Sequence, residues 1–158
     1  MKTDIVYASK ASRATTPNRA LAIHCSDHRF QDAFREFLSE GLGLTSYSII
    51  AIPGGGNFTS LVDIMPKFAK SGYQSLSFMI KRTGARRIIL MGHQDCLFFK
   101  DNLQYYFTES DLHEKQCASL RRAGVTLRER FETVTIEVYI ADAGDDNRIQ
   151  FLRIEQVL

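Results

Sequence analysis

The sequence has few cysteines, no long apolar run and little net charge, and the first two of these features each exclude a class of protein. Three cysteines in 158 residues, an odd number, argue against a disulfide framework. No apolar stretch approaches the length of a membrane span, and positions 1–20 lack the apolar core of a secretory signal. We therefore expect a cytoplasmic protein with no membrane partner, while a net charge of +2 neither favours nor excludes an acidic partner.

Length and composition predict a single domain preceded by a short arm. A chain of 158 residues that is 44% hydrophobic and 24% charged is ordinary for a globular domain and can bury roughly two thirds of its unfolded surface. Residues 1–19 mix Lys, Ser, Thr and Arg with Pro17 and show no sustained period. We assign 1–19 to an N-terminal arm and 20–158 to the domain.

Two apolar runs, 21–23 and 88–91, end in residues that bind metals or transfer protons. Cys25, Asp27 and Arg29 follow the first run, and His93 and Cys96 follow the second. Short continuous apolar runs are typical of buried strands, and parallel strands direct their carboxyl ends into one crevice. We expect Cys25, His93 and Cys96 to meet there.

Two thiolates and one imidazole suit Zn²⁺ and leave one tetrahedral position open. Asp27 is either a fourth ligand in a closed site or the neighbour of a water in an open one. Because two thiolates offset the metal charge, bound water is acidified less and a nearby proton acceptor becomes more useful. Arg29 lies two residues further along an extended segment, where it can hold Asp27 oriented and ionised.

Both motifs resemble those of a known enzyme family. Residues 25–29 fit the C-x-D-x-R motif of the β-class carbonic anhydrases, and residues 92–96 fit their G-H-x-x-C motif, in the same order. Residues 51–57 fall where that family has a strand followed by a turn. The resemblance, to a short divergent member, covers roughly residues 20–97; the C-terminal third is similar only in its helix-then-strand pattern.

The resemblance implies zinc ligation by Cys25, His93 and Cys96, with Asp27 and Arg29 as catalytic dyad. The implied reaction is reversible hydration of carbon dioxide to bicarbonate by a zinc-bound hydroxide. A homodimer or dimer of dimers is also implied, with sites at the subunit interface. The arm would then pack across a partner subunit, although simple fraying is an equal alternative.

Departures from the family pattern surround the expected substrate pocket rather than the ligands. Pro53 and Gly54 stand where the family usually has Arg-Asn, Leu97 stands where it has Gly, and His28 replaces a small residue. Two alternatives therefore stay open: hydrolysis of carbon disulfide or carbonyl sulfide, and a non-catalytic zinc-binding oligomeric module. A cysteine-dependent phosphatase is disfavoured, because its Arg follows the Cys by six positions whereas Arg29 follows Cys25 by four.

The remaining periodicity predicts an α/β fold with a mostly parallel sheet of four to five strands flanked by helices. The expected strands are 20–25, 47–52, 87–91, 133–140 with one wetter face, and 149–154 at an edge. Helices are expected over 30–41, over 58–83 with breaks near Pro66 and Gly72, and from Ser110 to Arg122 with a break or cap at Gly124. Asn57 is a plausible helix cap.

Several features suggest sites but have simpler interpretations. The glycine-rich turn 54–56 lacks the spacing and lysine of a phosphate-binding loop and indicates a close backbone approach beside the metal pocket. Basic residues near Gly84 are typical of a solvated helix end, so no nucleic-acid partner is expected. The aromatic residues between positions 98 and 107 are expected either to form core and dimer interface or to line an apolar pocket. His24 should face away from Cys25, His28 could rim the pocket, and His113 should lie at the surface.

Overall fold

A five-stranded sheet forms the centre of the molecule. The computed structural model describes residues 5–15, 17–62, 65–102 and 109–154. The strands, in chain order, are β1 (Ala20–His24), β2 (Ser48–Ala51), β3 (Arg87–His93), β4 (Thr135–Ala143) and β5 (Ile149–Arg153). Their order in the sheet is β2-β1-β3-β4-β5, with β5 antiparallel to β4 and the other pairs parallel. The predicted mostly parallel sheet is confirmed.

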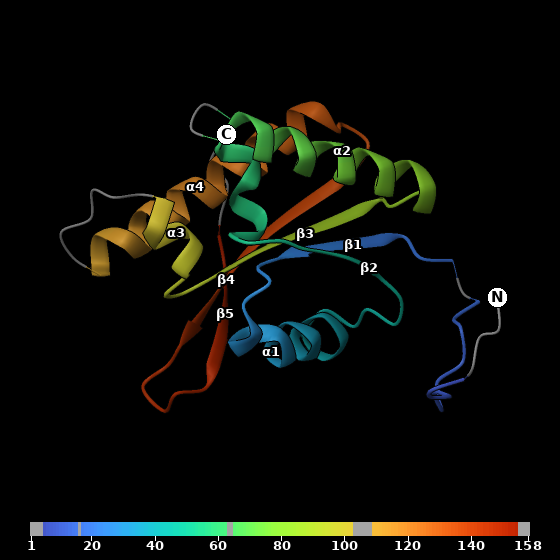
Figure 1. Cartoon of the computed structure of the whole chain (residues 1–158). Helices are drawn as coiled ribbons and strands as arrows, with labels where there is room; N and C mark the ends of the chain where they lie inside the picture. Colours follow the sequence, from blue (N-terminus) through green and yellow to red (C-terminus); the bar gives the residue numbers. More distant parts are fainter. Residues whose placement is uncertain (1–4, 16, 63–64, 103–108, 155–158) are drawn as a thin grey trace.

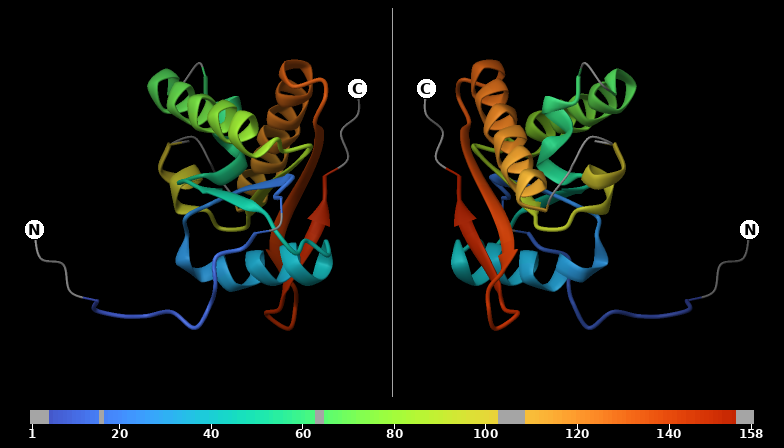
Figure 2. Two further views of the ribbon diagram at one scale, coloured as in Figure 1. Left: turned by 90° about the vertical axis from the view of Figure 1, so that its right-hand side faces the viewer. Right: turned by 90° about the vertical axis from the view of Figure 1, so that its left-hand side faces the viewer.

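Helices cover both faces of this sheet. Figure 1 shows α2 and α4 above the sheet and α1 below it, and both views in Figure 2 agree. The helices are α1 (Gln31–Glu36), which continues into the π-helical turn η2 (Phe37–Gly41), α2 (Pro66–Thr83), α3 (Leu97–Asn102) and α4 (Glu109–Arg130). Two short 3-10 turns, η1 (His28–Phe30) and η3 (Gly55–Ser60), follow the ends of β1 and β2.

Alternate residues of the central strands supply two separate cores. Leu21 and Ile23 of β1 pack in the core that includes Leu120 and Leu127 of α4. Ala22, between them, packs in the second core with residues of α1 and η2. Because successive strand side chains point to opposite faces, a strand covered on both sides must be apolar at every position. This explains the continuous apolar runs.

The segment before β1 is extended. Residues 5–15 have no regular secondary structure and are exposed to solvent; Figure 2 shows them running away from the body of the molecule. The division into an arm and a domain stays a prediction. Among the described residues, no helix combines the length and apolar character needed to cross a membrane.

The prediction that β4 has one wetter face is wrong. Glu137, Tyr139 and Ala141 alternate with the apolar residues of β4, yet all three are buried. Their face lies against the α1 layer, where the ring of Phe37 contacts that of Tyr139 at a centroid distance of 4.9 Å. Sequence periodicity alone did not reveal this cover.

Expected helix breaks at Gly72 and Gly124 are also wrong, because α2 and α4 run through both positions. Gly72 provides space instead: a Cβ there would overlap the ring of Phe58. Pro66 does begin α2, as the break expected there implied. Asn57 is not a helix cap; it lies inside η3 and donates through Nδ2 to Gly54 O at 3.0 Å. Residues 105–107, for which a role in the core, a dimer interface or an apolar pocket was expected, lie outside the described residues.

A buried carboxylate joins β3 to β4. The guanidinium of Arg87 pairs with both oxygens of Glu137, with Nη2 donating to Oε2 at 3.1 Å, and the Tyr139 hydroxyl donates to Oε2 at 2.7 Å. Burial of Glu137 opposes its ionisation, but the hydrogen bonds from Arg87 and Tyr139 prevail and lower its pKa. An ionised carboxylate in this position depends on its partners.

We predict that Arg87→Ala lowers the free energy of unfolding by about 2 kcal/mol at neutral pH, less than for a fully buried pair because Tyr139 remains. Since the pKa of folded Glu137 is lowered, its stabilisation is present above the unfolded pKa and is lost as pH falls through the folded value. The difference from wild type should shrink below about pH 4. Urea denaturation at several pH values measures this. Arg35→Ala, which breaks an exposed pair with Asp32, is the control and should have no effect; equal losses would contradict the prediction.

Candidate metal centre

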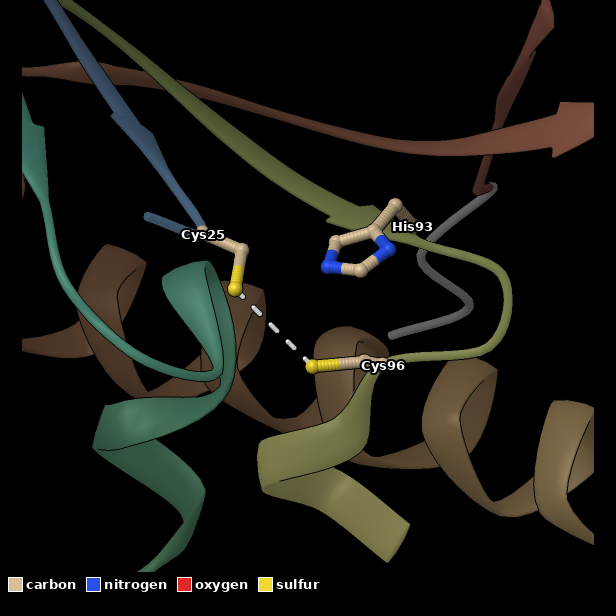
Figure 3. Close-up of side chains that lie close together, drawn as sticks. All are labelled: Cys25, His93 and Cys96. Atoms are coloured by element: carbon tan, nitrogen blue, oxygen red, sulfur yellow. Dashed lines mark hydrogen bonds between the residues drawn. The ribbon is translucent and has the colours of Figure 1, made fainter. Parts of the chain in front are cut away.

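Cys25, His93 and Cys96 meet at the carboxyl ends of neighbouring parallel strands. Cys25 follows β1, His93 ends β3, and Cys96 directly precedes α3. The two sulfur atoms lie 3.9 Å apart, and the three potential ligand atoms all lie within 4.8 Å of one another. All three side chains are buried. Figure 3 shows the imidazole facing the two cysteine side chains, so the structure has a buried group able to bind a metal ion.

The orientation of His93 leaves one ring nitrogen directed at this group. Nδ1 donates to the backbone oxygen of Gln94 at 2.7 Å, and the ring packs on Phe30 at a centroid distance of 4.2 Å. Nε2 is buried and has no hydrogen-bond partner among the residues that the structure describes. A buried polar atom without a partner is rare and calls for an explanation. A metal ion at Nε2 supplies one, since a ligating histidine commonly donates its other N–H to a backbone carbonyl.

The sulfur atoms of the two thiols lie 3.9 Å apart, within reach of a hydrogen bond between them. That bond from Cys96 lowers the pKa of Cys25 against the effect of burial, and the same pairing raises the pKa of Cys96. A divalent cation between the sulfurs stabilises both as thiolates. Together with a neutral imidazole, this donor set fits Zn²⁺ and leaves a fourth position.

Asp27 and Arg29 form a close ion pair beside the three residues. Arg29 donates from Nη2 to Asp27 Oδ2 at 2.7 Å and from Nε to Oδ1 at 3.1 Å, and its backbone N–H donates to Oδ1 at 3.0 Å. The hydrogen bonds from the Arg29 side chain lower the pKa of Asp27 to about 2, against the opposing effect of burial. Asp27 Oδ2 lies 3.9 Å from His93 Nε2. The expected pairing of these two residues is present, close to the potential ligands.

Three further side chains position the site, and the sequence analysis did not identify them. Gln31 donates to the backbone oxygens of Cys25 at 2.9 Å and Asp27 at 2.6 Å. Gln116 donates to His93 O at 2.7 Å. Asp95 accepts from Arg29. Asp95 lies inside the second motif and was recognisable as a candidate, whereas the two glutamines carry no local signal.

The glycine-rich turn lies against the backbone at the ends of β1 and β3. Gly55 has φ +55°, and a Cβ there would lie 2.6 Å from Cys25 N and 2.8 Å from Met91 O. Both contacts are with backbone, which cannot move aside easily. The predicted close backbone approach is therefore confirmed. At neighbouring Gly54, with φ +77°, a Cβ would lie 2.5 Å from the ring of Phe98, so the turn leaves space for an aromatic ring.

The other histidines take different positions. His24 is buried, stacks on Phe34 at a centroid distance of 4.7 Å and donates from Nδ1 to Cys25 O. His28 is exposed and its Nδ1 lies 4.0 Å from Asp27 Oδ1. His113 was expected at the surface; it is half-buried and lines a cavity of about 830 Å³ that Arg29 also lines.

Comparison with known proteins depends on the fold, because no protein-family model and no curated protein matches this sequence. A carbonic anhydrase of Streptococcus mutans is similar with a TM-score of 0.55 and 19% identity, over 91% of this chain and 88% of that one. A β-carbonic anhydrase of Trichomonas vaginalis is similar with a TM-score of 0.53 and 17% identity, over 94% and 90% of the two chains. This chain has the β-carbonic anhydrase fold.

The structural likeness extends beyond the two motifs. It covers at least nine tenths of this chain in both comparisons, and therefore most of the C-terminal third. A β-carbonic anhydrase of Aspergillus fumigatus is similar over 90% of this chain, with 14% identity and a TM-score of 0.51. At identities this low, the likeness shows the fold alone. A function for this chain must therefore be argued from the residues of its site.

We predict that Gly55→Ala is far more damaging than Gly43→Ala. Both glycines have positive φ, so both variants lose about 1 kcal/mol to backbone strain, but a Cβ at Gly43 contacts nothing within 4 Å. Overlap with the backbone at Cys25 should raise the loss at Gly55 to about 3 kcal/mol. Chemical denaturation measures both losses, and zinc content reports displacement of Cys25. Equal losses would show that the close approach is unimportant.

Proposed function

We propose that this chain is a β-carbonic anhydrase that binds Zn²⁺ through Cys25, His93 and Cys96 and catalyses reversible hydration of carbon dioxide to bicarbonate. The observation that carries the proposal is the buried Nε2 of His93, which lies within 4.8 Å of two sulfur atoms and has no hydrogen-bond partner in the described part of the chain. The adjacent Asp27–Arg29 pair supports it, as does the fold. A homodimer or dimer of dimers and a cytoplasmic location remain predictions.

Cys25, His93 and Cys96 would hold Zn²⁺, which would acidify a water molecule and so supply the nucleophile. Asp27 orients that group by accepting its hydrogen bond. With a pKa of about 2, Asp27 stays ionised and does not retain a proton at neutral pH. The proton released by the reaction therefore passes on to solvent, and the role of Arg29 is to keep the Asp27 acceptor charged and directed.

An apolar wall beside the sulfurs favours a small uncharged substrate. Cys25 and Cys96 pack in one buried cluster with Phe99 and Leu112, and Phe98 packs against it. Such a cluster accommodates carbon dioxide without a desolvation penalty. Carbon disulfide and carbonyl sulfide share this character, so hydrolysis of either is the alternative activity.

Stopped-flow hydration of carbon dioxide on metal-quantified protein tests the proposal. Wild type should carry one zinc per chain and be active. Asp27→Ala should keep its zinc and lose about 100-fold or more in kcat/KM, the usual loss when a group that orients a reacting species is removed. Cys96→Ser should lose both zinc and activity. The matched control is Cys117→Ser in α4, which lies outside the ligand group and should retain both.

Stoichiometric zinc with no hydration at any pH would exclude carbon dioxide as substrate. Activity toward carbon disulfide or carbonyl sulfide would then identify a hydrolase, and inactivity toward all three would identify a non-catalytic zinc-binding module. Zinc retained in Cys96→Ser and lost in Cys117→Ser would exclude the proposed ligand set itself.

A further inference from the structure

Asp95 connects the turn that carries the candidate ligands to the Asp27–Arg29 pair. It lies between His93 and Cys96 and has φ +57°, a left-handed conformation shared by only one other non-glycine residue of the described chain, Asn147. This conformation is uncommon outside glycine, although aspartate tolerates it. It also lets one residue present both its backbone oxygen and its carboxylate to Arg29.

The Arg29 guanidinium is held from two sides. Nε and Nη2 donate to Asp27, while Nη1 donates to Asp95 Oδ2 at 3.1 Å and Nη2 also donates to Asp95 O at 3.0 Å. The second carboxylate oxygen of Asp95 pairs with Lys100. Because Lys100 balances the charge of Asp95, Arg29 remains an effective partner for Asp27.

The contact with Asp95 restrains the long and partly exposed side chain of Arg29. The Arg29 side chain is 39% exposed. An arginine that is hydrogen-bonded along a single edge of its guanidinium retains more rotamer freedom than one bonded along two edges. If Arg29 turned away, Asp27 would lose the hydrogen bonds that direct its carboxylate. Its Oδ2 lies 3.9 Å from His93 Nε2, close enough for the carboxylate to turn and take the fourth ligand position.

We propose that Asp95 is a positioning residue that fixes Arg29 from the side opposite Asp27, and thereby keeps Asp27 paired with Arg29 and off the metal. This inference rests on the proposed metal site, but not on the identity of the substrate. Asp95 would therefore set the balance between an open site, which accepts a ligand from solvent, and a closed site, in which Asp27 binds the metal.

Azide titration of the cobalt-substituted protein, followed by visible absorption, measures this balance directly. A site closed in nine molecules out of ten binds azide about tenfold more weakly, because apparent affinity scales with the open fraction. Asp95→Gly keeps the left-handed backbone and removes the carboxylate, and it should show this loss. Asp95→Asn keeps an acceptor for Arg29 and should bind azide within about twofold of wild type. Asn147→Gly, the other positive-φ position, is the control and should match wild type.

A double variant identifies the residue that closes the site. In Asp95→Gly/Asp27→Ala, azide affinity should return to that of Asp27→Ala alone, because the competing carboxylate is gone. Unchanged azide affinity in Asp95→Gly would overturn the proposal, and so would a loss that Asp27→Ala fails to restore. Carbon dioxide hydration measured on the same samples keeps the two proposals separate: an inactive wild type that binds cobalt and azide would refute the substrate while leaving the azide comparison decisive for Asp95.

Discussion

The parallel pairing of β1 with β3 is the constraint on which the rest of the structure depends. The register places Ile23 opposite Leu90, so Cys25 continues level with Gly92 and next to His93. A slip of one residue would turn the alternating side chains of β1 toward the wrong cores and separate the two motifs. The covering of both sheet faces by helices holds this register in place.

The candidate ligands lie where β1 and β3 end. Two thiols and an imidazole nitrogen lie within 4.8 Å in an otherwise apolar cluster, with a charged pair beside them. Arg29 lies between two carboxylates, and Lys100 offsets the second of them. The site therefore combines a softer, buried set of metal donors with a more exposed network of charges that orients one acceptor.

Local sequence patterns predicted the elements that bear the site, because short apolar runs and two compact motifs are visible without knowledge of the fold. The strands, their parallel arrangement and the meeting of Cys25, His93 and Cys96 follow from those patterns. Cover of the Glu137 face, the tight packing of Gly72 and the contacts of Gln31 and Gln116 arise from residues distant in sequence. Asp95 marks the limit of what the sequence can predict. Its place in the second motif was visible, but its contact with Arg29 depends on how two loops approach each other.

Zinc K-edge X-ray absorption on protein carrying one zinc per chain tests the central claim most directly. We expect a first shell of two sulfur atoms at about 2.3 Å and two nitrogen or oxygen atoms at about 2.0–2.1 Å. Cys25→Ser protein that still holds metal should show one sulfur fewer. A shell with no sulfur, or with four, would contradict a zinc site built from Cys25, His93 and Cys96.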